Sequence, residues 1–271
     1  MNAQPTTSVR SVDSPRYAES LAGQLLQAEA DRMACAPLTD ADPQLSLELA
    51  YRIQDEALSQ RIERGETITG IKLGLTSPAK QAQMGVSAPL TAWLTDAMVL
   101  PLGTPLPHHR LIHPRIEPEI TFVMGRRLEG PGVTAATALA AVDCVYASLE
   151  VIDSRYQDFR FTLPDVIADN ASSAYYVTGT IGANPRTLDL RLEGCLLHVN
   201  GELAASGLGA AVQGHPAEAL AMAANSLARR GHAIDAGWVV MTGGITDAVT
   251  VDTQATVSAQ FTHLGSVEVS G

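Results

Sequence analysis

The sequence has few cysteines, and none stands in the spacing of a disulfide framework or a zinc knuckle. Only three of the 271 residues are cysteine, and Cys35, Cys144 and Cys195 form no C-x-x-C pair. An odd number of scattered thiols is typical of a reducing compartment. The polar N-terminus MNAQPTTSVRSVDSP also lacks the apolar segment of a secretion signal. We therefore expect a cytoplasmic protein.

Long apolar runs and an excess of basic residues are absent as well. No run approaches the roughly 18 residues that would span a bilayer, so we expect no membrane segment. The 18 Lys and Arg residues stand against 29 Asp and Glu residues, and the formal net charge is −11. Because phosphate backbones bind to basic surfaces, we expect neither nucleic acid nor an anionic membrane as a partner.

The common nucleotide and hydrolase motifs are missing too. G-x-G-x-x-G, the P-loop, G-x-S-x-G and H-E-x-x-H do not occur. Their absence removes the commonest dinucleotide, NTPase, serine-hydrolase and zinc-protease interpretations. What is present is an ordinary globular composition, with 46% hydrophobic and 17% charged residues. The chain is long enough to bury a substantial core.

The patterns of apolar residues divide the chain into three regions. Residues 1–15 are rich in Ser, Thr and Pro and are expected to form a flexible tail. Residues 16–68 predict a helical lobe, with Ser46 as the N-cap of a helix that ends at Gly65. Residues 69–271 predict a β-rich catalytic core, because short apolar runs there are separated by Gly and Pro.

The third region contains recognisable strand, turn and helix signals. Asn200-Gly201 predicts a type I′ hairpin. Residues 216–230 predict a helix with Pro216 in its first turn and Gly231 just past its end. Strands are expected at 68–75, 98–100, 116–124, 145–152 and 238–242 and within 249–269. Since helices and strands do not alternate regularly, we expect an α+β fold rather than a doubly wound sheet.

A pair of acids stands in the segment HPRIEPEITFVMG, residues 113–125. Glu117 and Glu119 are two apart in a strand-like run, so both side chains are expected on one face. Adjacent carboxylates repel each other, and a divalent cation or basic neighbours relieve the repulsion. The alternative is a solvated strand face beside Arg115.

A third acid, Glu150, lies in the apolar run ASLEVID. A buried acid is costly unless it is paired or bound to a metal. Three carboxylates from two strands suit Mg²⁺ or Mn²⁺ better than zinc. The alternative is an ion pair of Glu150 with Arg115 or Arg155.

A lysine in the segment GIKLGLTS, residues 70–77, is the next candidate. Lys72 lies between apolar residues, where its ammonium needs an acidic or substrate partner. The turn formed by Leu75, Thr76 and Ser77 can present backbone N–H groups to an anion. A small carboxylate substrate would satisfy both features. The alternative is a lysine with a buried stem whose ammonium reaches solvent.

Four motifs together resemble a known group of enzymes. They are GIKLGLTS at 70–77, EPE at 117–119, LEVIDSR at 149–155 and ADNAS at 168–172. This combination resembles the 2-hydroxypentadienoate hydratase and 4-oxalocrotonate decarboxylase group of the fumarylacetoacetate hydrolase superfamily, from about residue 40 to the C-terminus. The resemblance implies an α+β fold in which a mixed β core, a sandwich or roll, carries an N-terminal helical lobe.

The segments 94–96, 113–115 and 156–165 resemble the decarboxylase branch of that group. This implies metal-dependent decarboxylation of 2-oxo-3-hexenedioate (4-oxalocrotonate) to 2-hydroxypenta-2,4-dienoate and CO₂, in the meta-cleavage degradation of aromatic compounds. It also implies a homo-oligomer and a complex with the pathway's hydratase. Two alternatives stay open: hydration of the dienoate to 4-hydroxy-2-oxopentanoate, and a non-catalytic partner subunit. A decarboxylase must receive a second carboxylate at the distal end of its substrate, for which Arg115, Arg155 and Arg160 are candidates.

The resemblance also assigns roles to residues. It implies that Glu117, Glu119 and Glu150 hold Mg²⁺ or Mn²⁺, and that Lys72 and the turn at 75–77 stabilise the dienolate. The segment 153–173 is dense in polar residues, and we expect a loop that covers the site and excludes water. The further substrate contacts expected are Arg155, Tyr156, Arg160, Asp169 and Ser173, with Tyr156 and Arg160 nearer the distal carboxylate.

Overall fold

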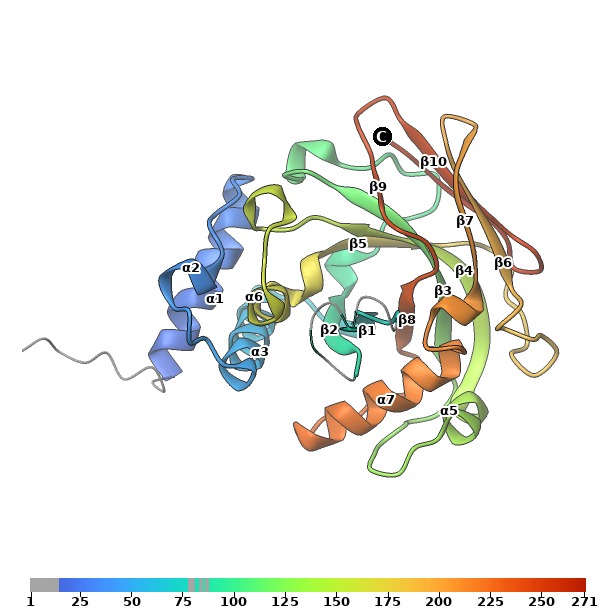
Figure 1. Cartoon of the computed structure of the whole chain (residues 1–271), viewed down its shortest axis with the longest axis horizontal. Helices are drawn as coiled ribbons and strands as arrows, with labels where there is room; N and C mark the ends of the chain where they lie inside the picture. The colour runs from blue at the N-terminus through green and yellow to red at the C-terminus, as the bar shows by residue number, and fades with distance from the viewer. Residues whose placement is uncertain (1–14, 78–80, 83–84, 86–87) are drawn as a thin grey trace, which may run out of the picture.

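The computed structural model describes residues 15–77, 81–82, 85 and 88–271. The expected tail therefore lies, except for Pro15, outside the described residues. In Figure 1 the N-terminal helices form a lobe at one end of the molecule, and two β-sheets with their covering helices make up the rest. The α+β class expected from the sequence is confirmed. None of the described helices is both long and apolar enough to cross a membrane.

The lobe consists of helices, and signals in the sequence mark both ends of the third one. Its N-terminal helices are α1 (Pro15–Asp31), α2 (Leu38–Ala41) and α3 (Leu47–Glu63). Ser46 caps α3 as predicted, because its side-chain oxygen accepts a hydrogen bond of 3.1 Å from the backbone N–H of Leu49. Gly65 adopts a φ of +100°, the left-handed conformation in which helices often end.

Later residues complete the core of this lobe. Helix α6 (Leu163–Ala168) packs on α3, and Tyr156 and Ile167 are buried in the same apolar cluster as Leu25 and Ile53. The segment 153–173 contains helix α6 and is folded onto the lobe rather than forming a loop throughout, and its covering of the site stays a prediction. The division of the chain at residue 68 stays a prediction.

The larger sheet is strongly curved and has the order β2-β1-β8-β3-β4-β5, with β9 beside β3. Its strands are β1 (Ile68–Gly74), β2 (Leu90–Thr95), β3 (Arg115–Met124), β4 (Val142–Ile152), β5 (Ser173–Thr178), β8 (Val239–Gly244) and β9 (Val249–Thr250). Only β1 and β8 pair in parallel; the other neighbours are antiparallel. The sheet curls far enough that the hydroxyls of Tyr176 on β5 and Thr69 on β1 lie 3.5 Å apart.

The smaller sheet has the order β11-β10-β6-β7 and packs against β4. Its strands are β6 (Gly194–Val199), β7 (Glu202–Leu208), β10 (Thr256–Phe261) and β11 (Gly265–Ser270). Asn200 and Gly201 join β6 to β7 with φ values of 53° and 81°, as a type I′ turn requires, so the predicted hairpin is confirmed.

Helices α5 (Ala135–Ala141) and α7 (Pro216–Arg229) pack on each other, and α7 also contacts β2 and β8. The main apolar core includes residues from both sheets and from α7. The expected strand at 98–100 is wrong, because Asp96–Met98 forms a 3₁₀ turn and only Val99 makes a bridge, to Tyr176. Four further short 3₁₀ segments occur among the described residues: His108–Arg110, Gln157–Phe159, Asn170–Ser172 and Gly209–Ala211.

Candidate metal and substrate site

Three carboxylates converge on one face of the larger sheet. Glu117 and Glu119 share a face of β3 because they are two residues apart, and Glu150 lies directly opposite Glu117 on β4. One carboxylate oxygen from each acid lies within 4.8 Å of the others. Glu119 is 0% exposed and Glu150 1%. The alternative of a solvated strand face is therefore wrong.

Lys72 provides the positive charge of this cluster. It lies on β1, is 3% exposed, and its Nζ is 2.8 Å from Glu150 Oε1. The alternative in which the ammonium reaches solvent is wrong, and so is an arginine partner for Glu150. The structure thus brings together the four residues that the sequence assigned to metal binding and catalysis.

Two buried carboxylate oxygens in this cluster lack a partner. Glu119 Oε1 and Glu150 Oε2 accept no hydrogen bond within the described part of the chain, while Glu119 Oε2 accepts one of 2.8 Å from the Gly243 N–H. Three carboxylates and one ammonium carry a formal charge of −2, which one divalent cation would neutralise. An all-carboxylate donor set suits Mg²⁺ or Mn²⁺, whereas zinc favours nitrogen and sulfur. The residues present therefore fit a hard divalent ion.

The pKa values of two acids in this cluster are raised. Burial, followed by the charges of Glu150 and Glu117, raises the pKa of Glu119 well above its ordinary value. Burial also raises the pKa of Glu150 to about 7, although the neighbouring Lys72 opposes the shift. Both shifts favour the protonated acids, so a cation would compete with protons for these carboxylates.

Two glycines at the end of β8 make room for these groups. A Cβ on Gly244 would overlap Glu117 Oε2, and a Cβ on Gly243, whose φ is +111°, would overlap the Thr76 side chain. The backbone of β8 can therefore approach both the acid and the turn that follows β1. Reasoning from the residues missed this role, although a Gly-Gly pair ending an apolar strand is a signal of close backbone approach.

The predicted anion-binding turn lies beside the carboxylates. Leu75 has a φ of +55°, so the chain turns sharply after β1. Thr76 is buried against Gly243, and its carbonyl accepts a 3.0 Å hydrogen bond from the Gln213 N–H. Ser77 is half-buried, and Pro78 lies outside the described residues. Binding of substrate by this turn stays a prediction.

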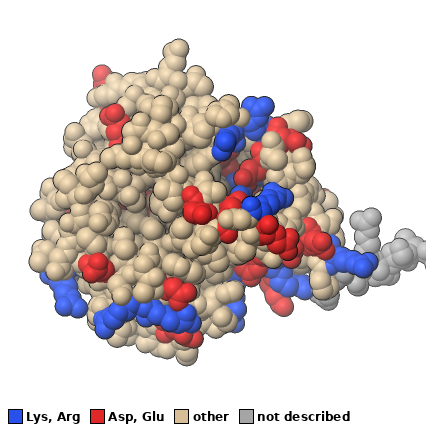
Figure 2. Space-filling view, turned by 180° about the vertical axis from the view of Figure 1, so that it is seen from behind, with Lys and Arg blue, Asp and Glu red and all other residues tan. Residues whose placement is uncertain are grey.

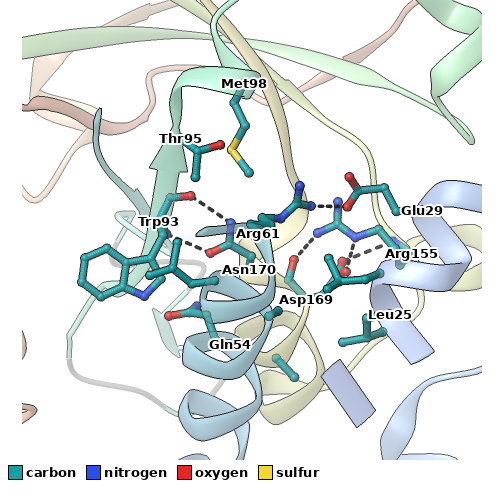
Figure 3. A pocket seen from close by; sticks show the side chains of 14 residues that line it. Leu25, Glu29, Gln54, Arg61, Trp93, Thr95, Met98, Arg155, Asp169 and Asn170 are labelled. Carbon is teal, nitrogen blue, oxygen red and sulfur yellow. Dashed lines mark hydrogen bonds and ion pairs between the residues drawn. The ribbon is translucent and has the colours of Figure 1, made fainter. Parts of the chain in front are cut away.

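Arg155 and Asp169 form a buried ion pair within a second cluster. Arg155 donates from Nε to Asp169 Oδ1 and, at 2.9 Å each, from Nη1 to the carbonyl oxygens of Asp153 and Ser173. Figure 3 shows the pair between Leu25 and Glu29 of α1 and Asn170. The cavity beside it measures about 20 Å³ for water-sized spheres, which is room for roughly one water and too small for a six-carbon substrate.

The remaining predicted contacts make other interactions within the chain or line a cavity. Tyr156 is 0% exposed and donates from its hydroxyl to the Asp165 carbonyl at 3.1 Å, within the lobe. Arg160 is exposed and binds Asp40 of α2 through two hydrogen bonds of 2.6 and 3.0 Å. Ser173 lines a cavity of about 320 Å³ that Arg155 also lines, and its Oγ has no hydrogen-bond partner in the part of the chain that is described. Contact of these residues with substrate stays a prediction.

Comparison with known proteins covers most of the chain. Residues 67–270 match the family model for the fumarylacetoacetate (FAA) hydrolase C-terminal region. The chain is 45% identical over 248 residues to 4-oxalocrotonate decarboxylase of Pseudomonas putida, which covers 92% of this chain and 94% of that protein. It is 42% identical over 212 residues to 2-hydroxypent-2,4-dienoate hydratase of Pseudomonas putida, covering 78% of this chain and 96% of the hydratase.

A solved structure agrees with the fold over nearly the full length. The 4-oxalocrotonate decarboxylase from Pseudomonas putida G7, complexed with magnesium and adipate, superposes with a TM-score of 0.92. The superposition covers 95% of this chain and 98% of that one, at 41% identity. The β core with its N-terminal helical lobe is therefore shared with that protein.

Proposed function

The chain belongs to the fumarylacetoacetate hydrolase family, and we propose that it is a metal-dependent carboxy-lyase acting on 2-oxo-3-hexenedioate (4-oxalocrotonate). The products are CO₂ and 2-hydroxypenta-2,4-dienoate, in the meta-cleavage breakdown of aromatic compounds. The observation that supports this most is the convergence of three carboxylates with the buried Lys72 on one face of the sheet. The 45% identity to a decarboxylase favours this branch.

We propose Mg²⁺, with Mn²⁺ as the alternative, as the ion held by Glu117, Glu119 and Glu150. The unpartnered oxygens of Glu119 and Glu150 and the formal charge of the cluster support this assignment. So does the magnesium in the related decarboxylase. A divalent ion bound at these acids would supply Lewis-acid polarisation of the substrate's 2-oxo group.

The chain's own residues then stabilise charge and exclude water. As the bond between carbon 5 and the distal carboxyl carbon breaks, its electron pair moves through the conjugated carbons to the 2-oxygen. The Lys72 ammonium, held in place by Glu150, stabilises the negative charge that develops there. Protonation of that oxygen completes 2-hydroxypenta-2,4-dienoate. We propose that backbone N–H groups of the turn at Leu75, Thr76 and Ser77 orient the proximal carboxylate.

Hydration of 2-hydroxypenta-2,4-dienoate is the second candidate, and the 42% identity to a hydratase favours it. The metal ligands and Lys72 would serve both reactions. A non-catalytic partner subunit is disfavoured, because such a chain has no reason to keep all four groups.

One assay separates the three candidates. The purified protein is incubated with Mg²⁺ and 2-oxo-3-hexenedioate, and CO₂ and 4-hydroxy-2-oxopentanoate are both measured. Release of CO₂ that precedes any hydration product supports the decarboxylase. Hydration of supplied dienoate without CO₂ release from the dicarboxylate would identify a hydratase. If the protein catalyses neither reaction and does not bind Mg²⁺, the result would identify a non-catalytic subunit.

We also propose that the protein works in the cytoplasm as a homo-oligomer that associates with the pathway's hydratase. The cysteines support a reducing compartment, since all three are free thiols. Strand β7 supports self-association: it lies at the edge of the smaller sheet, and Leu203 on it is 59% exposed. If light scattering gives the mass of a single chain, the homo-oligomer is refuted. Co-purification with the hydratase tests the complex.

A further inference from the structure

Arg115 begins strand β3 on the same face as two of the acids. Alternation along a strand places Arg115, Glu117 and Glu119 on one side. A strand rises about 3.3 Å per residue, so Arg115 lies about 6.6 Å along β3 from Glu117. The residue is half-buried, so solvent and ligands can still reach it.

The charge of Arg115 is not neutralised within the described part of the chain. Its guanidinium carbon lies 3.9 Å from the centroid of the Phe159 ring, and no described carboxylate forms an ion pair with it. The other two candidate arginines differ in this respect, because Arg155 is paired with Asp169 and Arg160 with Asp40. Of the three, only Arg115 keeps its charge available for a ligand.

The ring beneath Arg115 is held in place at some conformational cost. Asp158 and Phe159 both adopt left-handed backbone conformations, with φ values of 57° and 54°, which are uncommon for residues other than glycine. The Phe159 ring also contacts His113, and the two ring centroids lie 4.7 Å apart. The Nε2 atom of His113 is 2.8 Å from the Ser154 carbonyl oxygen. This stack holds the guanidinium over the Phe159 ring.

We propose that Arg115 binds the distal carboxylate of the substrate and so selects a dicarboxylate; this inference rests on the proposed function. An extended six-carbon dicarboxylate spans about 6 Å between its two carboxyl carbons, so a substrate whose 2-oxo end lies at the acids can extend its distal carboxylate along the face that carries Arg115. A guanidinium offers the planar pair of donors that a carboxylate accepts, and an aromatic platform leaves that edge free.

The reaction determines how this contact acts. The distal carboxylate leaves as neutral CO₂, so Arg115 holds the substrate more strongly than the transition state. A contact of this kind lowers KM and does not raise kcat. Arg115→Met, which keeps an unbranched side chain but removes the guanidinium, is expected to raise KM for 2-oxo-3-hexenedioate by about 10- to 100-fold, with kcat unchanged or raised and not lowered.

The direct test is binding without turnover. Calorimetry in saturating Mg²⁺ compares adipate with hexanoate, which has the same six carbons but only one carboxylate. We expect the unaltered protein to prefer adipate. Arg115→Met should weaken adipate binding by about 10- to 100-fold and leave hexanoate unchanged. Arg191→Met is the matched control, because Arg191 is exposed and paired with Asp189, and it should bind as the unaltered protein does.

The outcomes separate the two proposals. An adipate preference that survives in Arg115→Met and disappears in Arg160→Met would overturn the assignment and move it to Arg160. Equal binding of adipate and hexanoate by the unaltered protein, with no CO₂ release, would overturn the dicarboxylate substrate itself and Arg115's role with it.

Discussion

At the scale of single residues, Lys72 is the most unusual side chain in the molecule. Lysine occurs only twice in the sequence, at 72 and 80, and Lys72 is buried beside Glu150. A buried ion pair contributes little net stability, because desolvation of both charges offsets their attraction. Function is therefore the better explanation for its position.

Substitution of Lys72 is expected to damage catalysis more than metal binding. In Lys72→Ala, kcat should fall by on the order of 10²-fold or more, because the charge that develops on the substrate loses its stabilising ammonium. Mg²⁺ affinity by calorimetry should not decrease, since the cluster becomes more negative. Turnover at the unaltered rate would contradict the catalytic role.

Substitution of Glu119 is expected to stabilise the metal-free protein and to weaken metal binding. Glu119→Gln keeps the shape but removes a buried charge whose raised pKa shows that it is costly without a cation. The metal-free variant should therefore melt at a higher temperature than the metal-free parent, while Mg²⁺ affinity falls by more than about tenfold. Glu202→Gln, on an exposed position of β7, is the control. A lower melting temperature with unchanged affinity would argue against a metal ligand.

At the scale of elements, the approach of β8 to β3 decides where Glu117 can lie. Gly244→Ala would place a methyl group against the Glu117 carboxylate. We expect weaker Mg²⁺ binding and a destabilisation of about 1–3 kcal/mol, the usual cost of overpacking. Gly23→Ala is the matched control: it lies within α1 with open space around it, and should stabilise by about 0.5–1 kcal/mol. Equal metal affinity in both variants would show that Glu117 tolerates the methyl group.

Elements with a strong local period could be predicted from the sequence, and those defined by distant partners could not. Strands β3 and β4 and the β6–β7 hairpin follow from alternation and from Asn200-Gly201. Strand β2 was missed because every one of its residues is buried, so no alternation is present. Helix α6 has only six residues, and its capping box of Thr162 and Asp165 was overlooked.

The same distinction explains the candidate site. The acids were predictable because an i, i+2 pair and a lone acid in an apolar run are local signals. The segment 153–173 was expected to be a loop, and helix α6 within it was missed, because some of its polar groups bind partners far along the chain. Asp165, for example, accepts hydrogen bonds from Thr39, 126 residues away. Polarity in a sequence does not reveal whether the partner is a substrate or another part of the fold.

At the scale of the whole molecule, charges of both signs are mixed on the surface, whereas the carboxylate cluster carries an excess of negative charge. Figure 2 shows basic and acidic side chains interspersed near the N-terminal lobe and again along the lower edge of that face. Exposed pairs such as Arg160 with Asp40 contribute little to stability, because water and salt screen them. The carboxylate cluster is the opposite case, since three acids share one lysine away from solvent. Its protonation should therefore influence the stability of the entire fold.

The sign of this influence follows from Glu150. Its pKa is raised to about 7 in the folded protein against about 4.5 when unfolded, so between these values the folded metal-free state binds more protons. The stability contributed by this group is complete below pH of about 4.5 and is lost as the pH rises through about 7.

A divalent ion binds the deprotonated acid. It therefore stabilises the fold most at the pH values where the metal-free protein is least stable. The increase in melting temperature on adding Mg²⁺ should therefore grow from pH 5 to pH 7.5 and then level off. Comparing each pH with and without Mg²⁺ cancels titrating groups outside the cluster, and Glu150→Gln should show a smaller rise with pH, with Glu119 responsible for what remains. An increase that is the same at pH 5 and pH 7.5 would mean that protons and the metal do not compete for these carboxylates.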